Sequence, residues 1–197
     1  MSWQLLRKIS GCTDVTFTVL YDANVLYPNV LRDVLIRLAQ TGLVHARWTD
    51  QILDEMFVNL AEDRPDIDAS TLTRLRKLMN EAIPDCLVSG YESLIPALAL
   101  PDADDRHVLA AAIRAGAQVI VTANLRHFPQ EGLAEFGIEA MHPDEFVMDL
   151  FNLDGVRVHQ AVSATAAVWR NPPGTPADVC DRLAAAGLPI AAAALRR

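Results

Sequence analysis

Apolar residues along this chain fall into two alternating patterns, short continuous runs and stripes with helical spacing. The run from Phe17 to Tyr21 is apolar and partly β-branched, and it predicts a buried strand. Pro28 then opens a stretch whose apolar residues recur three and four positions apart, and Gly42 ends this predicted helix. The alternation continues to about residue 150, which favours parallel strand pairing and a doubly wound α/β sheet.

The same criteria predict further strands and helices in this part of the chain. The predicted strands are Val44–Trp48, Cys86–Val88, Gln118–Thr122 and Gly137–Met141. The predicted helices begin after Thr49, at Ser70, at Asp102 and at Pro143. Thr49 and Asp102 are of the residue types that cap helices, and Gly116 is a typical helix stop.

No strand is predicted after Asp154. Val156–Trp169 has a helical pattern, Asn171–Gly174 breaks it, and Thr175 starts a capped second helix, with only an alanine-rich turn expected after Gly187. We therefore expect three parts, which are a lead-in of residues 1–14, an α/β domain of residues 15–152 and a helical C-terminal extension of residues 153–197.

The charge balance narrows the choice of partners. The chain carries 17 basic and 25 acidic residues, a net charge of −8, which disfavours binding of nucleic acid through bulk positive charge but not through metal ions held by acids. Its three cysteines are far apart and odd in number, which argues against a disulfide framework or a zinc site. With no apolar run of about 18 residues and no signal peptide, we expect a cytoplasmic protein without membrane contact.

Asp22 and Asn24 follow directly on the first predicted strand. The carboxyl ends of strands are where open α/β sheets place their ligands. Both residue types also shape strand-to-helix turns, so this pair alone leaves either role open.

Asp105 is a second candidate. Counting three, four and seven residues on from it meets only apolar residues, so Asp105 shares the apolar face of its predicted helix. An unpaired carboxylate on such a face is strongly unfavourable unless a cation or donors meet it. The helix dipole explains Asp102 and Asp104 better than Asp105, so we favour a functional role for Asp105.

Three further polar residues extend this group. Glu55 lies on the flank of its helix's apolar stripe, and Thr122 and Asn124 close a long apolar strand as Asp22 closes the first. Solvation alone would explain Glu55 if it had no polar neighbours. Carboxylate and carbonyl oxygens gathered without matching lysines suit Mg²⁺ or Mn²⁺, so the pattern predicts one hard-oxygen metal site.

Four stretches resemble the motifs of PIN-domain ribonucleases, in particular the VapC-like toxins of bacterial toxin–antitoxin pairs. They are Val19–Leu26, the helix around Glu55, Pro101–Ala112 and Val119–Pro129. The resemblance covers about Val15 to Leu150, and longer members of the toxin-like branch carry a tail similar to the one that follows. It implies a three-layer α/β/α domain with a parallel sheet of order 3-2-1-4-5 and metal-dependent cleavage of single-stranded or structured RNA.

The resemblance also implies residue roles and partners. It places Asp22, Glu55 and Asp105 on the family's three acidic positions, with Asp22 and Asp105 holding the metal and Glu55 as a direct or water-mediated ligand. Asn124 stands where many members have a fourth aspartate, and it would orient a water or a metal-bound ligand. Implied partners are RNA, a cognate antitoxin and a second copy of the chain. Additional candidates for the site are Asp102, Asp104, Thr122 and Asn24.

Arg126 and His127 follow the predicted site directly. They either contact the scissile or a neighbouring phosphate or belong to a solvated loop, and the sequence leaves both open.

Two other functions would also suit parts of this pattern. A phosphoacceptor signalling domain also gathers acids above a parallel sheet, but it needs a lysine after a late strand, and neither Lys8 nor Lys77 follows one. A catalytically silent PIN-like interaction module is the alternative that remains, and the presence of all three acids argues against it.

Overall fold

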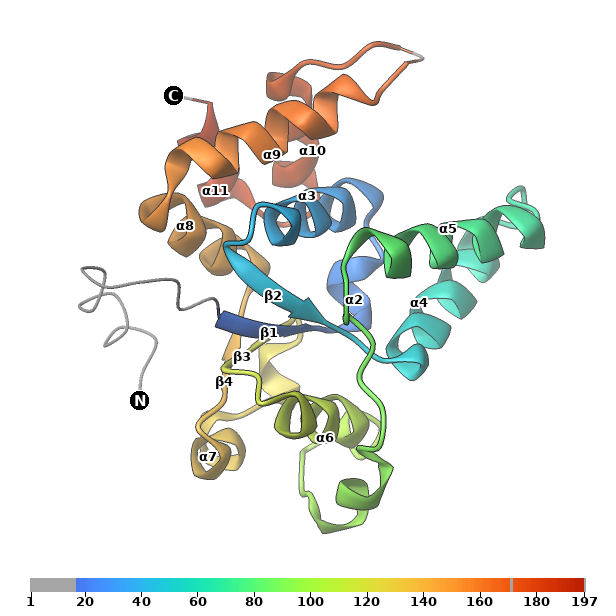
Figure 1. Cartoon of the computed structure of the whole chain (residues 1–197), viewed down its shortest axis with the longest axis vertical. Helices are drawn as coiled ribbons and strands as arrows, with labels where there is room; N and C mark the ends of the chain where they lie inside the picture. The colour runs from blue at the N-terminus through green and yellow to red at the C-terminus, as the bar shows by residue number, and fades with distance from the viewer. Residues whose placement is uncertain (1–16, 171, 197) are drawn as a thin grey trace.

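The computed structural model describes residues 17–170 and 172–196 (Figure 1). The predicted lead-in of residues 1–14 lies outside them. Among the described residues, four parallel strands form one sheet, in the order β2-β1-β3-β4. They are β1 (Phe17–Tyr21), β2 (Val44–Arg47), β3 (Val119–Val121) and β4 (Glu139–Met141).

The predicted strand Cys86–Val88 is reduced to a single parallel bridge between Leu87 and Trp48, just past the end of β2. The chain on either side has left-handed backbone, with φ of 56° at Asp85 and 71° at Gly90. Because left-handed residues leave the extended conformation, the pairing cannot continue. The four observed strands thus have the predicted order, and the predicted third strand is only a bridge at the β2 edge of the sheet.

β1 lies inside the sheet, between β2 and β3, and Val19, Leu20 and Tyr21 are fully buried there. Tyr21 pairs with Val121 at the ends of β1 and β3. The backbone N–H of Asp22 donates to the Val121 carbonyl at 3.2 Å. This register places the residues that follow the two strands side by side.

Helices cover both faces of the sheet, which gives three layers (Figure 1). From residue 17 onward, the helices that precede β3 are α2 (Ala23–Leu26), α3 (Asn29–Gln40), α4 (Asp50–Asp63), α5 (Ala69–Ala82), the 3-10 helix η2 (Glu92–Ala97) and α6 (Arg106–Ala115). Thr49 caps α4 by accepting a hydrogen bond from the Ile52 N–H, as predicted. Pro28 is the N-cap residue of α3 rather than its first residue.

The start of α6 differs from the prediction. The helix begins at Arg106, and Asp105 is its N-cap residue, so Asp102 does not cap it. Asp102 instead accepts a hydrogen bond from the Asp104 N–H at 3.0 Å, within a turn of its own. An aspartate bonded to the backbone two residues on stabilises a turn in competition with the helix.

The rest of the chain is mostly helical. After β3 come η3 (Leu125–His127), α7 (Gln130–Leu133) and η4 (Ala134–Phe136), and after β4 come α8 (Pro143–Leu153), α9 (Gly155–Ala167), α10 (Pro176–Ala185) and α11 (Pro189–Leu195). In Figure 1 the helices α8 to α11 gather on the α3 side of the sheet, away from α6 and α7. Among the described residues, no helix has the length and apolar character needed to cross a membrane.

The alanine-rich stretch after Gly187 forms the helix α11 rather than one turn. Asp144 on α8 explains its stability, because its carboxylate accepts hydrogen bonds from the N–H groups of Ile190 at 3.1 Å and Ala191 at 2.7 Å. The first N–H groups of a helix have no partner within the helix, so a buried carboxylate can satisfy them. A side chain of α8 therefore holds α11 in place.

Candidate active site

A cavity of about 770 Å³ opens at the carboxyl ends of β1 and β3. Its lining includes all four residues predicted to be catalytic, Asp22, Glu55, Asp105 and Asn124. Three more carboxylates line it, from Asp54, Glu62 and Asp63, whereas no lysine or arginine is among its described lining residues. Six acids surround one opening, and Asp54 among them pairs with Arg76 of the neighbouring helix, so the cleft is acidic.

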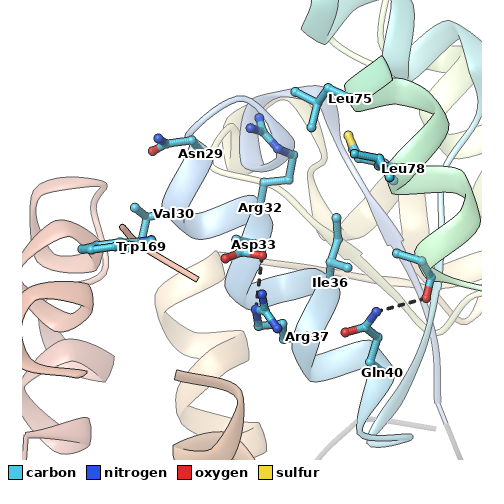
Figure 2. A pocket seen from close by; sticks show the side chains of 12 residues that line it. Asn29, Val30, Arg32, Asp33, Ile36, Arg37, Gln40, Leu75, Leu78 and Trp169 are labelled. Atoms are coloured by element: carbon cyan, nitrogen blue, oxygen red, sulfur yellow. Dashed lines mark hydrogen bonds and ion pairs between the residues drawn. The ribbon is translucent and has the colours of Figure 1, made fainter. Parts of the chain in front are cut away.

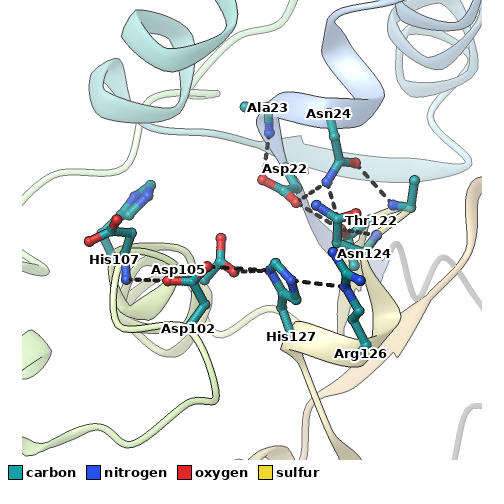
Figure 3. A network of polar contacts seen from close by, with 12 residues as sticks. Asp22, Ala23, Asn24, Asp102, Asp105, His107, Thr122, Asn124, Arg126 and His127 are labelled. Atoms are coloured by element: carbon teal, nitrogen blue, oxygen red, sulfur yellow. Dashed lines mark hydrogen bonds and ion pairs between the residues drawn. The ribbon is translucent and has the colours of Figure 1, made fainter.

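Asp22 is the most buried of these acids, with 5% of its surface exposed. One carboxylate oxygen, Oδ1, accepts from the Ala23 N–H at 2.7 Å and caps α2. The other, Oδ2, accepts from Thr122 Oγ1 at 2.7 Å and from Asn24 Nδ2 at 2.5 Å (Figure 3). Burial raises the pKa of Asp22, hydrogen bonds from Thr122 and Ala23 lower it, and the nearby carboxylates of Asp105 and Glu55 raise it further.

Thr122 and Asn24 connect the two strand ends. Besides donating to Asp22, Thr122 Oγ1 accepts from Asn24 Nδ2 at 2.9 Å and from the Asn124 N–H at 3.0 Å. Asn24 Oδ1 accepts from the Ala123 N–H at 2.9 Å, across from β1 to the end of β3. Both candidates therefore lie against Asp22 and fix its position.

Asp105 is held by His127, at 2.6 Å between Oδ2 and the ring nitrogen Nδ1. Arg126 Nε donates to the other ring nitrogen, Nε2, at 3.1 Å (Figure 3). Because an arginine nitrogen can only donate, Nε2 of His127 accepts, and the proton on Nδ1 is donated to Asp105. His127 is thus engaged with a predicted site residue, whereas Arg126 is exposed.

Asp102 lies nearby, with its Oδ2 3.8 Å from Nδ1 of His127. Ligand atoms of Asp102, Asp105 and His127 all lie within 4.8 Å of one another, a spacing open to a metal ion. Asp104 is exposed and is not among the described residues that line the cavity.

Glu55, on α4, has 41% of its side chain exposed, and its Oε1 lies 2.8 Å from Nε2 of His107 on α6. The residues predicted from the sequence include the carboxylates of this motif but not His107. A signal was present, because His107 lies three and four residues before Ala110 and Ala111 on the face of α6 that is buried.

The donors around the cavity fit a hard divalent cation. Asp22, Glu55 and Asp105 provide carboxylate oxygens from β1, α4 and the start of α6, and the described lining offers no cationic side chain to neutralise them. Burial is the main cause of the raised pKa of Asp22, and the carboxylates of Asp105 and Glu55 add a repulsion that a bound cation would relieve.

A second cavity, of about 410 Å³, lies between α3, α5 and Trp169 (Figure 2). Asp33 is the carboxylate among its described lining residues, and it already pairs with Arg37, 3.2 Å away. This cavity therefore lacks the clustered acids of the first.

Comparisons with known proteins agree with this arrangement. A family model described as the PIN domain matches residues 18–126, more than half of the chain. A second, described as the VapC50 C-terminal domain, matches residues 143–197. No solved structure matches the chain.

The chain is also similar to a protein of Mycobacterium tuberculosis (strain ATCC 25618 / H37Rv) named "Putative ribonuclease VapC50". The two are 42% identical over 94 residues, which are 48% of this chain and 55% of that protein. The matched region thus spans about half the length of this relative.

Proposed function

Because the chain belongs to the PIN-domain family, we propose that it is a metal-dependent endoribonuclease and the toxin of a toxin–antitoxin pair. The observation that carries the proposal is the meeting of Asp22, Glu55 and Asp105 at one cavity over the strand ends. The name of the relative, a ribonuclease, supports the same reaction class. A silent interaction module would have no use for three acids held in this way.

Asp22 and Asp105 would hold Mg²⁺ or Mn²⁺, and Glu55 would bind the ion directly or through water. When bound, such an ion lowers the pKa of a water and offsets charge that builds on the phosphate. Each of the three carboxylates has a fixed donor on one side, namely Thr122 and Asn24 for Asp22, His127 for Asp105 and His107 for Glu55. Ligands held in this way need little rearrangement when a substrate enters.

The remaining residues act on the RNA. Asn124 lines the cavity and would orient the attacking water through its side-chain amide. Arg126, exposed beside His127, would contact a phosphate of the RNA next to the scissile bond. Since the cleft itself is acidic, the RNA backbone would be attracted by the cation and by residues at the rim.

A cognate antitoxin and a second copy of the chain are the proposed protein partners.

The test is cleavage of total RNA by the purified protein with Mn²⁺, with Mg²⁺ and with EDTA. Asp22→Asn removes the charge of one proposed ligand at constant size and should reduce cleavage by about 100-fold or more, since metal catalysis depends on it. Glu81→Gln makes the same chemical change on α5, outside the cavity, and should cleave like the unmodified protein. Undiminished cleavage in EDTA, or by Asp22→Asn protein, would refute the metal site.

A further inference from the structure

His107 is buried and contacts Glu55, which lines the acidic cavity. Only 3% of it is exposed, and its Nε2 lies 2.8 Å from Oε1 of Glu55. Its other ring nitrogen, Nδ1, is also buried and has no hydrogen-bond partner within residues 17–170 and 172–196. Since Nε2 faces a carboxylate, it carries a proton and donates to Glu55.

Core packing alone does not explain a histidine here. An apolar side chain of similar volume would fill the space beside Val108 without leaving a ring nitrogen unpaired. Nδ1 of His107 has no partner within the described residues, whereas Nε2 points at Glu55, a predicted site residue. This difference between the two nitrogens indicates a role that acts through Glu55.

Glu55 needs such a partner more than the other two acids do. Asp22 follows a buried strand and is held by three donors, and Asp105 is held by His127. Glu55 has a longer side chain with more rotatable bonds, is 41% exposed, and has His107 as its hydrogen-bonding partner within the described structure. Without that contact it would sample many rotamers in the cleft.

We propose that His107 is a positioning residue of this site, which holds Oε1 of Glu55 and leaves the second carboxylate oxygen free to bind the metal ion or a water on it. In the view of Figure 3, His107 and His127 lie on the two sides of Asp105, so two imidazoles support two of the three acids. His107 itself does not touch RNA or metal. Hydrogen-bonding partners of metal ligands commonly change affinity by about 10- to 100-fold when removed.

The inference rests on the proposed function, and its test combines Mn²⁺ binding by calorimetry with RNA cleavage. His107→Leu keeps the volume and loses the donor, so Mn²⁺ affinity and cleavage should each fall about tenfold or more. His107→Gln, whose amide nitrogen can reach Glu55, should restore most of both. Val108→Ala is the matched control, because it truncates the next buried residue of α6 and should lower the melting temperature without changing Mn²⁺ affinity.

A double-mutant cycle tests whether His107 acts through Glu55. In a Glu55→Ala background, adding His107→Leu should cause no further loss of Mn²⁺ affinity, since the acceptor of the His107 hydrogen bond is already removed. Equal losses in both backgrounds, or a His107→Gln protein no better than His107→Leu, would overturn the proposal. Should His107→Leu not fold, His107→Asn replaces it, because the shorter amide cannot reach Glu55.

The proposed function and the positioning role of His107 can be refuted separately. If the unmodified protein neither binds Mn²⁺ nor cleaves RNA, the proposed function falls and takes the role of His107 with it. If the unmodified protein does both and the His107→Leu protein matches it, the proposed function stands and only the positioning role is wrong.

Discussion

Two aspartates of this protein are almost equally buried and have different surroundings. Asp22 follows β1 and is 5% exposed, and Asp144 lies in the first turn of α8 and is 6% exposed. Each carboxylate caps a short helix, Asp22 the helix α2 and Asp144 the helix α11. Burial and hydrogen bonding therefore do not distinguish them.

The groups around the two aspartates do distinguish them. Asp144 binds the N-terminus of a helix, where N–H groups and the helix dipole favour a negative charge. Asp22 faces an open cavity together with Asp105 and Glu55, and its pKa is raised by burial and, in addition, by the charges of these two neighbours. A buried acid thus indicates function when like charges meet it across a cavity, and indicates structure when a helix N-terminus satisfies it.

The largest expected effect is the opposite response of the two sites to the same substitution. Asp22→Ala should abolish RNA cleavage while the metal-free protein melts at the same or a higher temperature, because like-charge repulsion is removed. Asp144→Ala should leave cleavage per folded molecule unchanged and lower the free energy of unfolding by about 1–2 kcal/mol, as expected for loss of a helix cap. Cleavage assays and urea unfolding measure the two quantities.

Asp181→Ala is the control for Asp144→Ala. Asp181 lies on α10, is 62% exposed and pairs with Arg196 at the surface, so its loss should change stability by less than about 1 kcal/mol. Cleavage lost in Asp144→Ala protein that remains folded would show that the two aspartates do not have separate roles.

Much of this comparison was within reach of the sequence. The run Phe17–Tyr21 predicted β1 and hence the place of Asp22, because a continuous apolar strand has few alternative positions in an α/β sheet. The family and the parallel order of strands are confirmed. The boundary at residues 152–153 stays a prediction, while the C-terminal family match already begins at residue 143.

What the sequence did not reveal depends on contacts between distant segments. His107 of α6 meets Glu55 of α4 only in the folded chain, and Asp144 meets Ile190 only because α11 folds back on α8. The predicted start of α6 is too early because aspartates such as Asp102 commonly cap helices. Only the structure shows that Asp102 forms a turn with Asp104 instead. Local propensity cannot choose between such competing hydrogen bonds.

Asn124→Asp adds a carboxylate to the cavity that Asp22 faces, and it tests whether the residue at this position binds the metal ion. Asn124 lines the cavity and offers a neutral oxygen, so an aspartate should tighten Mn²⁺ binding at this site several-fold. Half-maximal cleavage should then occur at a lower metal concentration. Asn59→Asp adds the same charge to the same cavity from α4 and should have a smaller effect, which separates ligation from general attraction. Equal effects of the two variants, or unchanged binding in calorimetry, would mean that Asn124 positions water or backbone instead.

The smallest expected effect is the pH dependence of stability in the metal-free protein. Burial and the neighbouring acids raise the pKa of Asp22 above its ordinary value of 3.8, although hydrogen bonds from Thr122 and Ala23 offset part of the rise. Between pH 3.8 and the raised pKa, the native state therefore keeps a proton on Asp22 that the unfolded chain has lost. This contribution to stability is complete below pH 3.8 and is lost as the pH rises through the raised pKa.

Asp22→Asn cannot titrate, so in EDTA its stability relative to the unmodified protein should increase as the pH rises from about 4 to about 7. Asp66→Asn should show the opposite trend, because a hydrogen bond from Arg64 lowers the pKa of Asp66, and its stabilising contribution is present above pH 3.8 and lost in acid. Urea unfolding of the three proteins at several pH values measures both trends. A stability difference for Asp22→Asn that does not vary with pH would show that burial and the neighbouring carboxylates do not raise the pKa of Asp22 in the metal-free fold, and the distinction drawn between Asp22 and Asp144 would then rest on cleavage alone.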